Sequence, residues 1–482
     1  MRARLGTVVV ALWVARSASA APRSEDPAER PADPPADRGA DRDEDSDLAR
    51  IPGDLAAAPA SAAVPAAGSV HSKLYADDAL TMAARRDVAV PFPPPTPYGR
   101  QNRTSLDGQL TWKASSEFSF VLSDRVDLIE QEGVALWSRQ AVRNALREAY
   151  VSWEPTARTY LEAGRLNVRA GVALGFNPTD FLRPSTLVGQ ASLDPSVLRL
   201  NRLGTVMLRA QRIWEGGSAS AVYAPRLFTP PAIGSTAIGI DPRIDATNAA
   251  HRGLAEVSSN LGELSAQLLV YLEPGRSKLG VNLTRPVGQS VIAYAEWAGG
   301  VEQSLIARAI DHGRKTGTLP MDAATPISTD PSRAFRSDVA AGAAWTIATT
   351  VTLNAEYHLH QGGLSRADWD RWFTAGRATP ALAGELWYIR GYANDQLEPV
   401  TRHQIFVRAD WPKAFVDHLE LTGFVFTSLA DGSTLSQITA SYYLSDAWTA
   451  ALSLGANLGT ARSERGSFPQ ATSGIAELVR YL

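Results

Sequence analysis

The segment RHQIFVRADW, at residues 402–411, decides the fold, because apolar and polar residues alternate along it. Ile405, Val407 and Ala409 fall on one face of an extended chain, and Gln404 and Arg408 fall on the other. The same period recurs, less regularly in places, in HLELTGFVFTS (418–428), LSQITASYYL (435–444), WTAALSLGANL (448–458) and TSGIAELVRYL (472–482). Segments of about ten residues with a period of two are typical of transmembrane β-strands. The C-terminal part of the chain therefore predicts consecutive membrane-spanning strands.

Further segments with this period extend the pattern back to Leu106. They lie at residues 106–122, 144–154, 158–169, 201–214, 217–227, 253–259, 263–272, 277–284, 289–298, 336–345 and 349–359. Together they predict an all-β fold, a transmembrane antiparallel up-and-down β-barrel of about sixteen strands. Long connections, at 123–143, 170–200, 228–252, 299–335 and 360–401, alternate with short turns. Bacterial outer-membrane barrels alternate in this way, with short periplasmic turns and long outer loops.

A soluble β-sandwich or jelly roll is the alternative fold, because its strands alternate as well. The aromatic residues favour the membrane barrel. They cluster at the ends of predicted strands, where the interfacial girdles of membrane barrels lie. The residues concerned are Trp153, Trp297, Trp345, Trp411, Tyr442 and Trp448.

The N-terminal part of the chain predicts two further segments. Residues 1–20 have the features of a secretory signal peptide: a charged start, an apolar core, and the small residues Ala18-Ser19-Ala20 before the cut. Residues 21–104 are rich in Pro and Ala and predict a disordered periplasmic linker, with a short helix at 77–86. The barrel is then expected to occupy residues 105–482.

Composition argues against several classes of partner and site. The chain carries 47 Lys and Arg against 50 Asp and Glu, so its formal net charge of −3 offers no reason to expect a nucleic-acid partner. It has no cysteine, which excludes disulfides, thiolate metal sites and lipid attachment at an N-terminal Cys. No cofactor is expected.

One stretch carries a family-like motif, in which Gly164-Arg165-Leu166-Asn167-Val168-Arg169 is followed by Gly171, Gly175 and Asn177-Pro178-Thr179-Asp180. It resembles porin-like bacterial outer-membrane barrels, the alginate-export type among them, in which a Gly-Arg strand end leads into an Asn-Pro-x-Asp loop. Turn chemistry alone explains Asn177 and Asp180, whose side chains can cap a turn. The alternative is that residues 170–188 fold into the lumen as a constriction loop. That loop would hold Asn177, Pro178 and Asp180, and Arg165, Arg169 and Arg183 would face solutes.

The inward-facing positions of the predicted strands carry charges of both signs. Such residues are usually solvated or paired, and they tune which ions pass. Besides the three arginines above, the expected pore-lining residues are Arg209, Arg402, Arg408, Glu148, Glu296, Glu356, Asp410 and Glu420. Because the signs are mixed, they predict neither anion nor cation preference.

Two other features could carry function. His358 and His360 lie near Glu356, but two His residues are not a metal site, and neither Gly-x-Ser-x-Gly nor His-Glu-x-x-His occurs. A solvated pair in the lumen is the favoured interpretation, so no catalytic residue and no metal ligand is predicted. Ser365 and Asp368 have capping-box spacing and begin a predicted helix, whose aromatic face would tuck into the barrel mouth or pack on its outer rim.

The predicted function is a porin-like channel of the cell outer membrane, through which small hydrophilic solutes or ions pass by diffusion. One alternative is a selective outer-membrane exporter or importer of a specific substrate, such as an anionic saccharide. Another is an outer-membrane barrel enzyme. The expected partners are outer-membrane lipid, small solutes or ions, and the barrel-assembly machinery, with a homotrimer left open.

Overall fold

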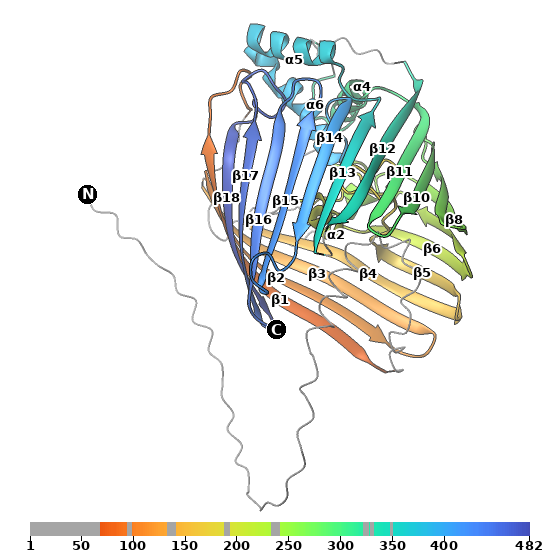
Figure 1. Cartoon of the computed structure of the whole chain (residues 1–482). Coiled ribbons are helices and arrows are strands. Elements are labelled where there is room, and N and C mark those ends of the chain that lie inside the picture. Colours follow the sequence, from red (N-terminus) through yellow and green to blue (C-terminus); the bar gives the residue numbers. More distant parts are fainter. Residues whose placement is uncertain are drawn as a thin grey trace, which may run out of the picture. The chain divides into compact units, whose positions relative to one another are not determined.

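The computed structural model describes residues 68–93, 99–132, 141–187, 193–232, 242–321, 327, 332–347 and 350–482. An 18-stranded antiparallel sheet closes on itself, because β1 pairs with both β2 and β18 (Figure 1). Closure leaves no edge strand, so the backbone of each strand pairs on both sides, as a spanning strand in lipid requires. The strands are β1 (Val70–Arg85), β2 (Arg100–Lys113), β3 (Phe118–Gln131), β4 (Val142–Thr156), β5 (Thr159–Leu166), β6 (Thr205–Trp214), β7 (Gly217–Ala224), β8 (Arg252–Leu261), β9 (Leu264–Leu272), β10 (Lys278–Val287), β11 (Val291–Glu302), β12 (Ala334–Ile347), β13 (Val351–His360), β14 (His403–Trp411), β15 (Leu419–Ser428), β16 (Thr434–Ser445), β17 (Trp448–Leu458) and β18 (Gln470–Tyr481).

Strands that follow one another in the sequence are neighbours in the sheet, which confirms the predicted up-and-down antiparallel topology. The connections after the even-numbered strands are short turns. Those after the odd-numbered strands include the long ones and contain every helix that the described ranges hold. The two kinds of connection therefore lie at opposite ends of the barrel.

The predicted strand number and the predicted start of the barrel are both wrong. The sheet has 18 strands rather than about sixteen, because β1 was not predicted and because β2 and β3 replace one predicted strand at 106–122. β1 lies inside the predicted linker, residues 21–104, and includes the 77–86 segment predicted as a helix. The predicted signal peptide, and the predicted linker up to residue 67, lie outside the described residues.

The composition of β1 explains why its alternation is weak. Asp78 occupies an outward position and accepts hydrogen bonds from Asn102 (3.0 Å) and from the Thr104 hydroxyl (2.6 Å), both on β2. The Ala and Met residues of this segment favour helix by propensity. Pairing with a strand on each side overrides that propensity, as tertiary context commonly does.

Alternate side chains along the strands face outward and inward, as the sequence pattern predicts. The outward ones include large apolar residues such as Leu208, Leu268 and Leu454, each more than half exposed (58%, 54% and 54%). Aromatic pairs on β2, β3 and β4 lie near the short-turn end of the barrel; the rings of Phe118 and Trp153, for example, stack at 6.0 Å. The wall thus has an apolar outer face, and aromatic pairs lie near the long connections as well, as Trp297 and Phe335 show.

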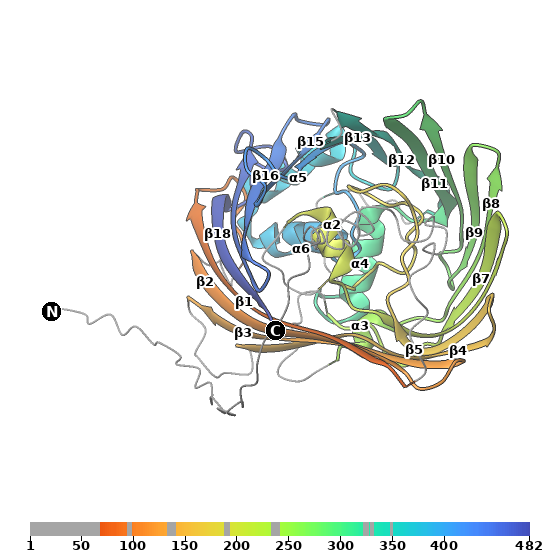
Figure 2. The ribbon, with the colours of Figure 1, turned by 60° about the horizontal axis from the view of Figure 1, so that its bottom comes forward.

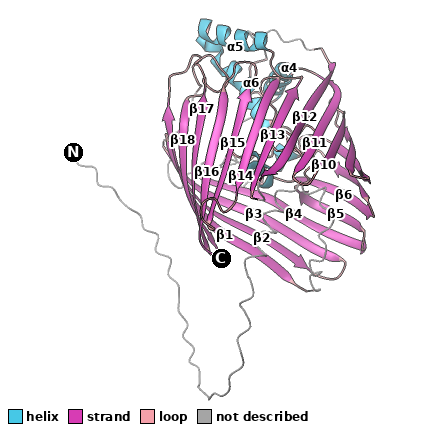
Figure 3. Ribbon diagram, in the orientation of Figure 1, coloured by secondary structure: helices cyan, strands magenta, loops and turns pink. Residues whose placement is uncertain are grey.

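The helices lie within the long connections. They are α2 (Pro195–Leu200), α3 (Ile244–Thr247), α4 (Leu305–Lys315), α5 (Arg366–Ala378), the 3₁₀ helix η1 (Pro380–Leu382) and α6 (Ala383–Asp395). Figure 2 shows α2, α4 and α6 within the ring of strands, and Figure 3 shows α5 beyond the strand ends. Ser365 and Asp368 form the predicted capping box at the start of α5. In the part of the chain described, no helix has both the length and the apolar character needed to cross a membrane.

Candidate functional site

The connection between β5 and β6 folds back into the barrel over its described residues, 167–187 and 193–204, and we call these residues the inward loop. Its residues Ala173 and Thr179 are fully buried. Its backbone amides bind carboxylates on the wall strands β11 and β13, and its helix α2 lies inside the ring (Figure 2). The inward loop therefore occupies part of the lumen.

Glu296 on β11 binds the first part of this loop. Its carboxylate accepts hydrogen bonds from the amide of Val172, from the amide of Ala173 (2.6 Å) and from the Thr179 hydroxyl (3.0 Å). Gly171 approaches the same carboxylate with a φ of +86°, and a Cβ there would stand 2.6 Å from a carboxylate oxygen. Glycine alone fits this position without strain.

Glu356 on β13 binds the next part of the loop. It accepts hydrogen bonds from the amides of Leu174 (2.7 Å) and Gly175 (2.9 Å). A Cβ at Gly175 would lie 2.7 Å from the rings of both His358 and Phe406. The two glycines of the motif thus mark the two places where the loop backbone lies against the barrel wall.

The second half of the inward loop is held by arginines. Arg202 forms a two-pronged ion pair with Asp180, at 2.6 and 3.2 Å, and also donates to the carbonyl of Val168. Arg183 lies over the ring of Phe176, 4.7 Å from its centroid. Asp180 therefore does more than cap a turn, because it fixes an arginine inside the barrel.

The connections after β1, β11, β13 and β17 share one apolar core, and we call α4, α5, α6 and this core the cap. The core contains Val90, Leu305, Ile306, Ile310, Leu319, Leu364, Trp369, Trp372, Phe373, Leu386, Trp387, Ile389 and Tyr392, with Phe468 packed against it. The aromatic face of α5, expected either to tuck into the barrel mouth or to pack on its outer rim, is buried within the cap.

Arg390 projects from α6 into this aromatic core. Its guanidinium lies 4.4 Å from the ring centroid of Trp387 and 4.2 Å from that of Phe468. It donates to the Ser467 hydroxyl (2.8 Å) and to the carbonyl of Glu464 (2.7 Å). Burial disfavours its charged form and lowers the pKa of Arg390 to about 9.

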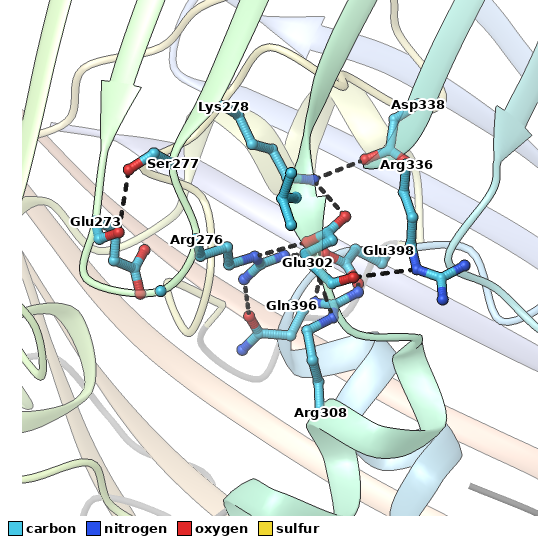
Figure 4. Close-up of polar contacts among 12 residues, drawn as sticks. Glu273, Arg276, Ser277, Lys278, Glu302, Arg308, Arg336, Asp338, Gln396 and Glu398 are labelled. Atoms are coloured by element: carbon cyan, nitrogen blue, oxygen red, sulfur yellow. Dashed lines mark hydrogen bonds and ion pairs between the residues drawn. The ribbon is translucent and has the colours of Figure 1, made fainter. Parts of the chain in front are cut away.

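Buried ion pairs link the cap to the wall at strands β10, β11 and β12 (Figure 4). Lys278 contacts Glu302 at 2.8 Å and Asp338 at 3.0 Å, all three on wall strands. Arg308 of α4 contacts Glu398, which follows α6, at 2.7 Å. Arg276 completes this ionic cluster by contacting Glu302 (3.2 Å) and Glu398.

The ionic cluster determines the charge state of Glu398. Burial alone would raise the pKa of its carboxyl, but the guanidiniums of Arg308 and Arg276 more than offset that effect. The pKa of Glu398 therefore lies well below its usual range. This carboxylate stays ionised and keeps the two helices fixed to the wall.

A cavity of about 400 Å³ lies between the inward loop, the cap and the inner faces of strands β14 to β18, and we call it the lumen cavity. Both polar and apolar side chains line it. They include Phe176, Asn177, Asp180, Arg183, Arg199, Arg202, Arg390, Asn394, Glu398, Gln404, Phe426, Asn457, Glu464 and Arg465. A solute in this space would meet charged, amide and aromatic groups together.

The predicted pore residues fall into two groups. Asn177, Asp180 and Arg183 border the lumen cavity. Glu296 and Glu356 face inward, but the inward loop covers both carboxylates, so we do not propose that they contact solute. The remaining predicted pore residues include several that form ion pairs or hydrogen bonds with other groups of the protein.

Several of these residues form pairs along the inner wall. Arg408 contacts Asp410 at 2.7 Å and Asp194 of the inward loop at 3.3 Å. Arg209 contacts Glu162 at 3.3 Å. These charges thus stabilise the wall and the loop.

Other predicted pore residues form hydrogen bonds with backbone groups or with a tyrosine hydroxyl. Arg165 donates to the carbonyls of Gly204 (2.9 Å) and Pro242, and Arg402 donates to the carbonyl of Gly363 (3.1 Å). Glu148 accepts a hydrogen bond from the amide of Asn167 (3.1 Å). Glu420 accepts one from the Tyr443 hydroxyl (2.7 Å). Arg169 and Pro178 belong to the inward loop, and Arg169 is half-buried.

His358 and His360 are fully buried rather than solvated. His358 contacts Glu356 at 2.7 Å, and His360 contacts Asp338 at 2.8 Å. Over the described ranges, no three His, Cys, Asp or Glu side chains are arranged to hold a metal ion. Both imidazoles thus pack beneath the inward loop and the cap.

The sequence pattern does not predict four arginines of the lumen cavity, namely Arg199, Arg202, Arg390 and Arg465. None lies on a strand, so the alternation of strands offers no signal for them. A partial signal exists for the first two. Asp194 and Pro195 have the pattern of a helix start, and two arginines one helical turn apart follow them.

No protein-family model matches the chain, and no curated protein matches it either. Its fold is similar to solved bacterial porin structures. OccK11 of Pseudomonas aeruginosa is 9% identical with a TM-score of 0.48, covering 86% of this chain and 98% of that one. OmpF of Salmonella typhi, in complex with daunomycin, is 11% identical with a TM-score of 0.44, covering 86% and 98%. A triple mutant of the Rhodopseudomonas blastica porin is 10% identical with a TM-score of 0.40, covering 86% and 100%. Because these values are low, the function proposed below rests on the barrel's own geometry.

Proposed function

We propose that this protein is an outer-membrane channel through which small hydrophilic solutes or ions cross. The single observation that carries the proposal is a closed barrel with an apolar outer wall and a cavity between polar inner elements. A barrel that serves as an enzyme does not require this combination.

The apolar outer wall supports a membrane location. Soluble proteins seldom expose large continuous apolar surfaces. Here outward side chains from neighbouring strands form such a surface, among them Leu268 on β9 and Leu283 on β10. Short turns at one end and long connections at the other match the periplasmic and outer ends of bacterial outer-membrane barrels.

The lumen supports a channel role. The inward loop and the cap narrow the barrel, and the lumen cavity is a space between them. Charged and amide groups line it, so a hydrophilic solute exchanges water for protein hydrogen bonds when it enters. This supports passage of small solutes rather than of large polymers.

Purified protein in planar lipid bilayers and in liposomes tests the proposal. We expect stepwise conductance, and liposome swelling that slows as the solute becomes larger. Heat-modifiable migration on gels confirms that the tested protein is a closed barrel. Folded barrel with neither conductance nor swelling would refute the channel, and release of the protein by carbonate would refute the membrane location.

The finer predictions from the sequence remain open to test. These are the likeness to alginate-export barrels, the barrel-assembly machinery as partner, and the homotrimer. The mass of the detergent-solubilised protein, corrected for bound detergent, separates a monomer from a trimer.

A further inference from the structure

Within the described part of the chain, the acidic side chains that line the lumen cavity all form ion pairs, whereas several of its arginines do not. Its three acidic residues are each held by a cationic group: Asp180 by Arg202, Glu398 by Arg308, and Glu464 by Arg465 at 3.3 Å. The acids of the cavity are therefore already neutralised by contact.

Three of its arginines lack such a partner. Arg183 donates to the carbonyl of Asn177, and Arg390 donates to one hydroxyl and one carbonyl. Arg199 donates to the carbonyls of Ala170 (2.9 Å) and Gly171 (2.8 Å). Among the described side chains, none of these three arginines forms an ion pair, so their positive charges are not neutralised by contact.

Burial makes these charges costly to maintain. Arg183 is 7% exposed and Arg390 is 4% exposed, and burial lowers the pKa of both groups. The carboxylates of Glu398 and Asp180 attract Arg183 and that of Glu464 attracts Arg390, but this attraction does not offset the hydration that the two guanidiniums lose on burial. An anion in the cavity would place a negative charge in direct contact with them, which favours an anionic occupant.

We propose that the lumen cavity binds small organic anions, through a carboxylate or a phosphate that Arg183, Arg199 and Arg390 attract. The proposal rests on the channel function above and names the class of solute that the channel selects. Guanidinium groups suit both anions, because their N–H donors match two oxygens at once.

The rest of the cavity limits the size and character of the anion. Its volume of about 400 Å³ admits a small metabolite. Asn394, Gln404 and Asn457 add amide groups that can bind hydroxyls. We therefore expect the anion to carry hydroxyl groups, as a sugar acid or a sugar phosphate does.

Binding to the folded, detergent-solubilised full chain tests the proposal without requiring conductance. Isothermal titration with gluconate, with glucose 6-phosphate and with glucose separates a carboxylate, a phosphate and a neutral sugar. We expect at least one anion to bind well above glucose, and binding of one anion alone identifies the charged group. Equal binding of all three probes, or no binding at all, would overturn the proposal.

Two charge-removing variants locate the site. Arg199→Gln and Arg183→Gln should each weaken anion binding about tenfold, the equivalent of about 1.4 kcal/mol. Arg285→Gln is the matched control, because Arg285 lies on β10 at the short-turn end, and its exposed side chain pairs with Glu263 outside the cavity. Equal weakening by the control would overturn the assignment.

Planar bilayers provide the second readout. With a salt gradient across the membrane, the reversal potential of the wild type should indicate anion preference, and Arg199→Gln should reduce it more than the control does. A conducting but cation-selective wild type would overturn the anion site and leave the channel function standing. Anion binding without any conductance would refute the channel and leave the site standing.

Discussion

Replacing Glu296 by Ala tests how the inward loop is held in the lumen. The carboxylate accepts hydrogen bonds from the buried amides of Val172 and Ala173. A buried donor left without a partner costs about 1–3 kcal/mol. The variant should therefore lose about 2–6 kcal/mol of the free energy that docks the loop, as the sum over two such donors. We expect the first part of the loop to detach and the single-channel conductance to rise.

Two comparison variants separate this cause from others. Glu296→Gln keeps a carbonyl oxygen for both amides, so its conductance should stay close to that of the wild type. Glu263→Ala removes an acid of equal charge from an exposed ion pair with Arg285, and it should change nothing. The same gel mobility shift on heating must be seen for all three variants, so that only folded barrels are compared.

The result that would refute the reasoning is a folded Glu296→Ala barrel with unchanged conductance and noise. The inward loop would then be held in place without this carboxylate, or it would not limit the passage of ions through the barrel. An equal rise for Glu296→Gln would show instead that the charge of Glu296, rather than its acceptor oxygen, holds the loop.

Three further predictions concern the wall and the cap. Leu454→Arg places a charge on the lipid-facing wall at a cost of about 2–4 kcal/mol, so the heat-modifiable fraction should fall, whereas Leu454→Phe should leave it unchanged. Ala76→Pro interrupts a strand that pairs on both sides, so less barrel should reach the outer-membrane fraction than with Ala76→Val; equal amounts would contradict a wall role for β1. Lowering the pH from about 7 to about 5 should leave the cap attached. The folded-state pKa of Glu398 lies below its unfolded value, so its stabilisation is present above the unfolded pKa and is lost only as the pH falls through the lowered one. Limited proteolysis of α5 checks this, and cleavage that begins above about pH 5 would count against it.

Local patterns in the sequence predict those features that depend on local geometry. The alternation along β14 and β15 places Phe406, Phe424 and Phe426 on the inward face, where their rings meet inside the barrel. The Ser365 and Asp368 spacing predicts the start of α5 to the residue. In each case the neighbours that decide the outcome lie within a few residues or on an adjacent strand.

The lumen cavity was only partly predictable, because distant contacts decide where the connections run. Val172 and Glu296 are far apart in the sequence, and nothing near either residue indicates that they meet. Arg390 lies on a helix whose mixed residues suggest no special role, yet the cap places its guanidinium among aromatic rings. The sequence motif from Gly164 to Asp180 points to the inward loop, but not to what the loop encloses.

The cap draws on both ends of the barrel's sheet. Val90 follows β1, and its carbonyl accepts a hydrogen bond from the Trp387 indole at 3.4 Å. Arg86, in the same connection, donates to the carbonyl of Phe468, just before β18, at 3.0 Å. β1 and β18 are the first and last strands, and their pairing is the seam that closes the cylinder.

Separating β1 from β18 would also disrupt the cap core, because the connections that follow β1 and precede β18 both contribute to it. Unfolding that begins at the terminal strands must therefore also disrupt the aromatic cap core, and this coupling raises the barrier to unfolding of the barrel. Val90 and Phe468 come from opposite ends of the strand order, so both reach the cap core only in a barrel that has closed.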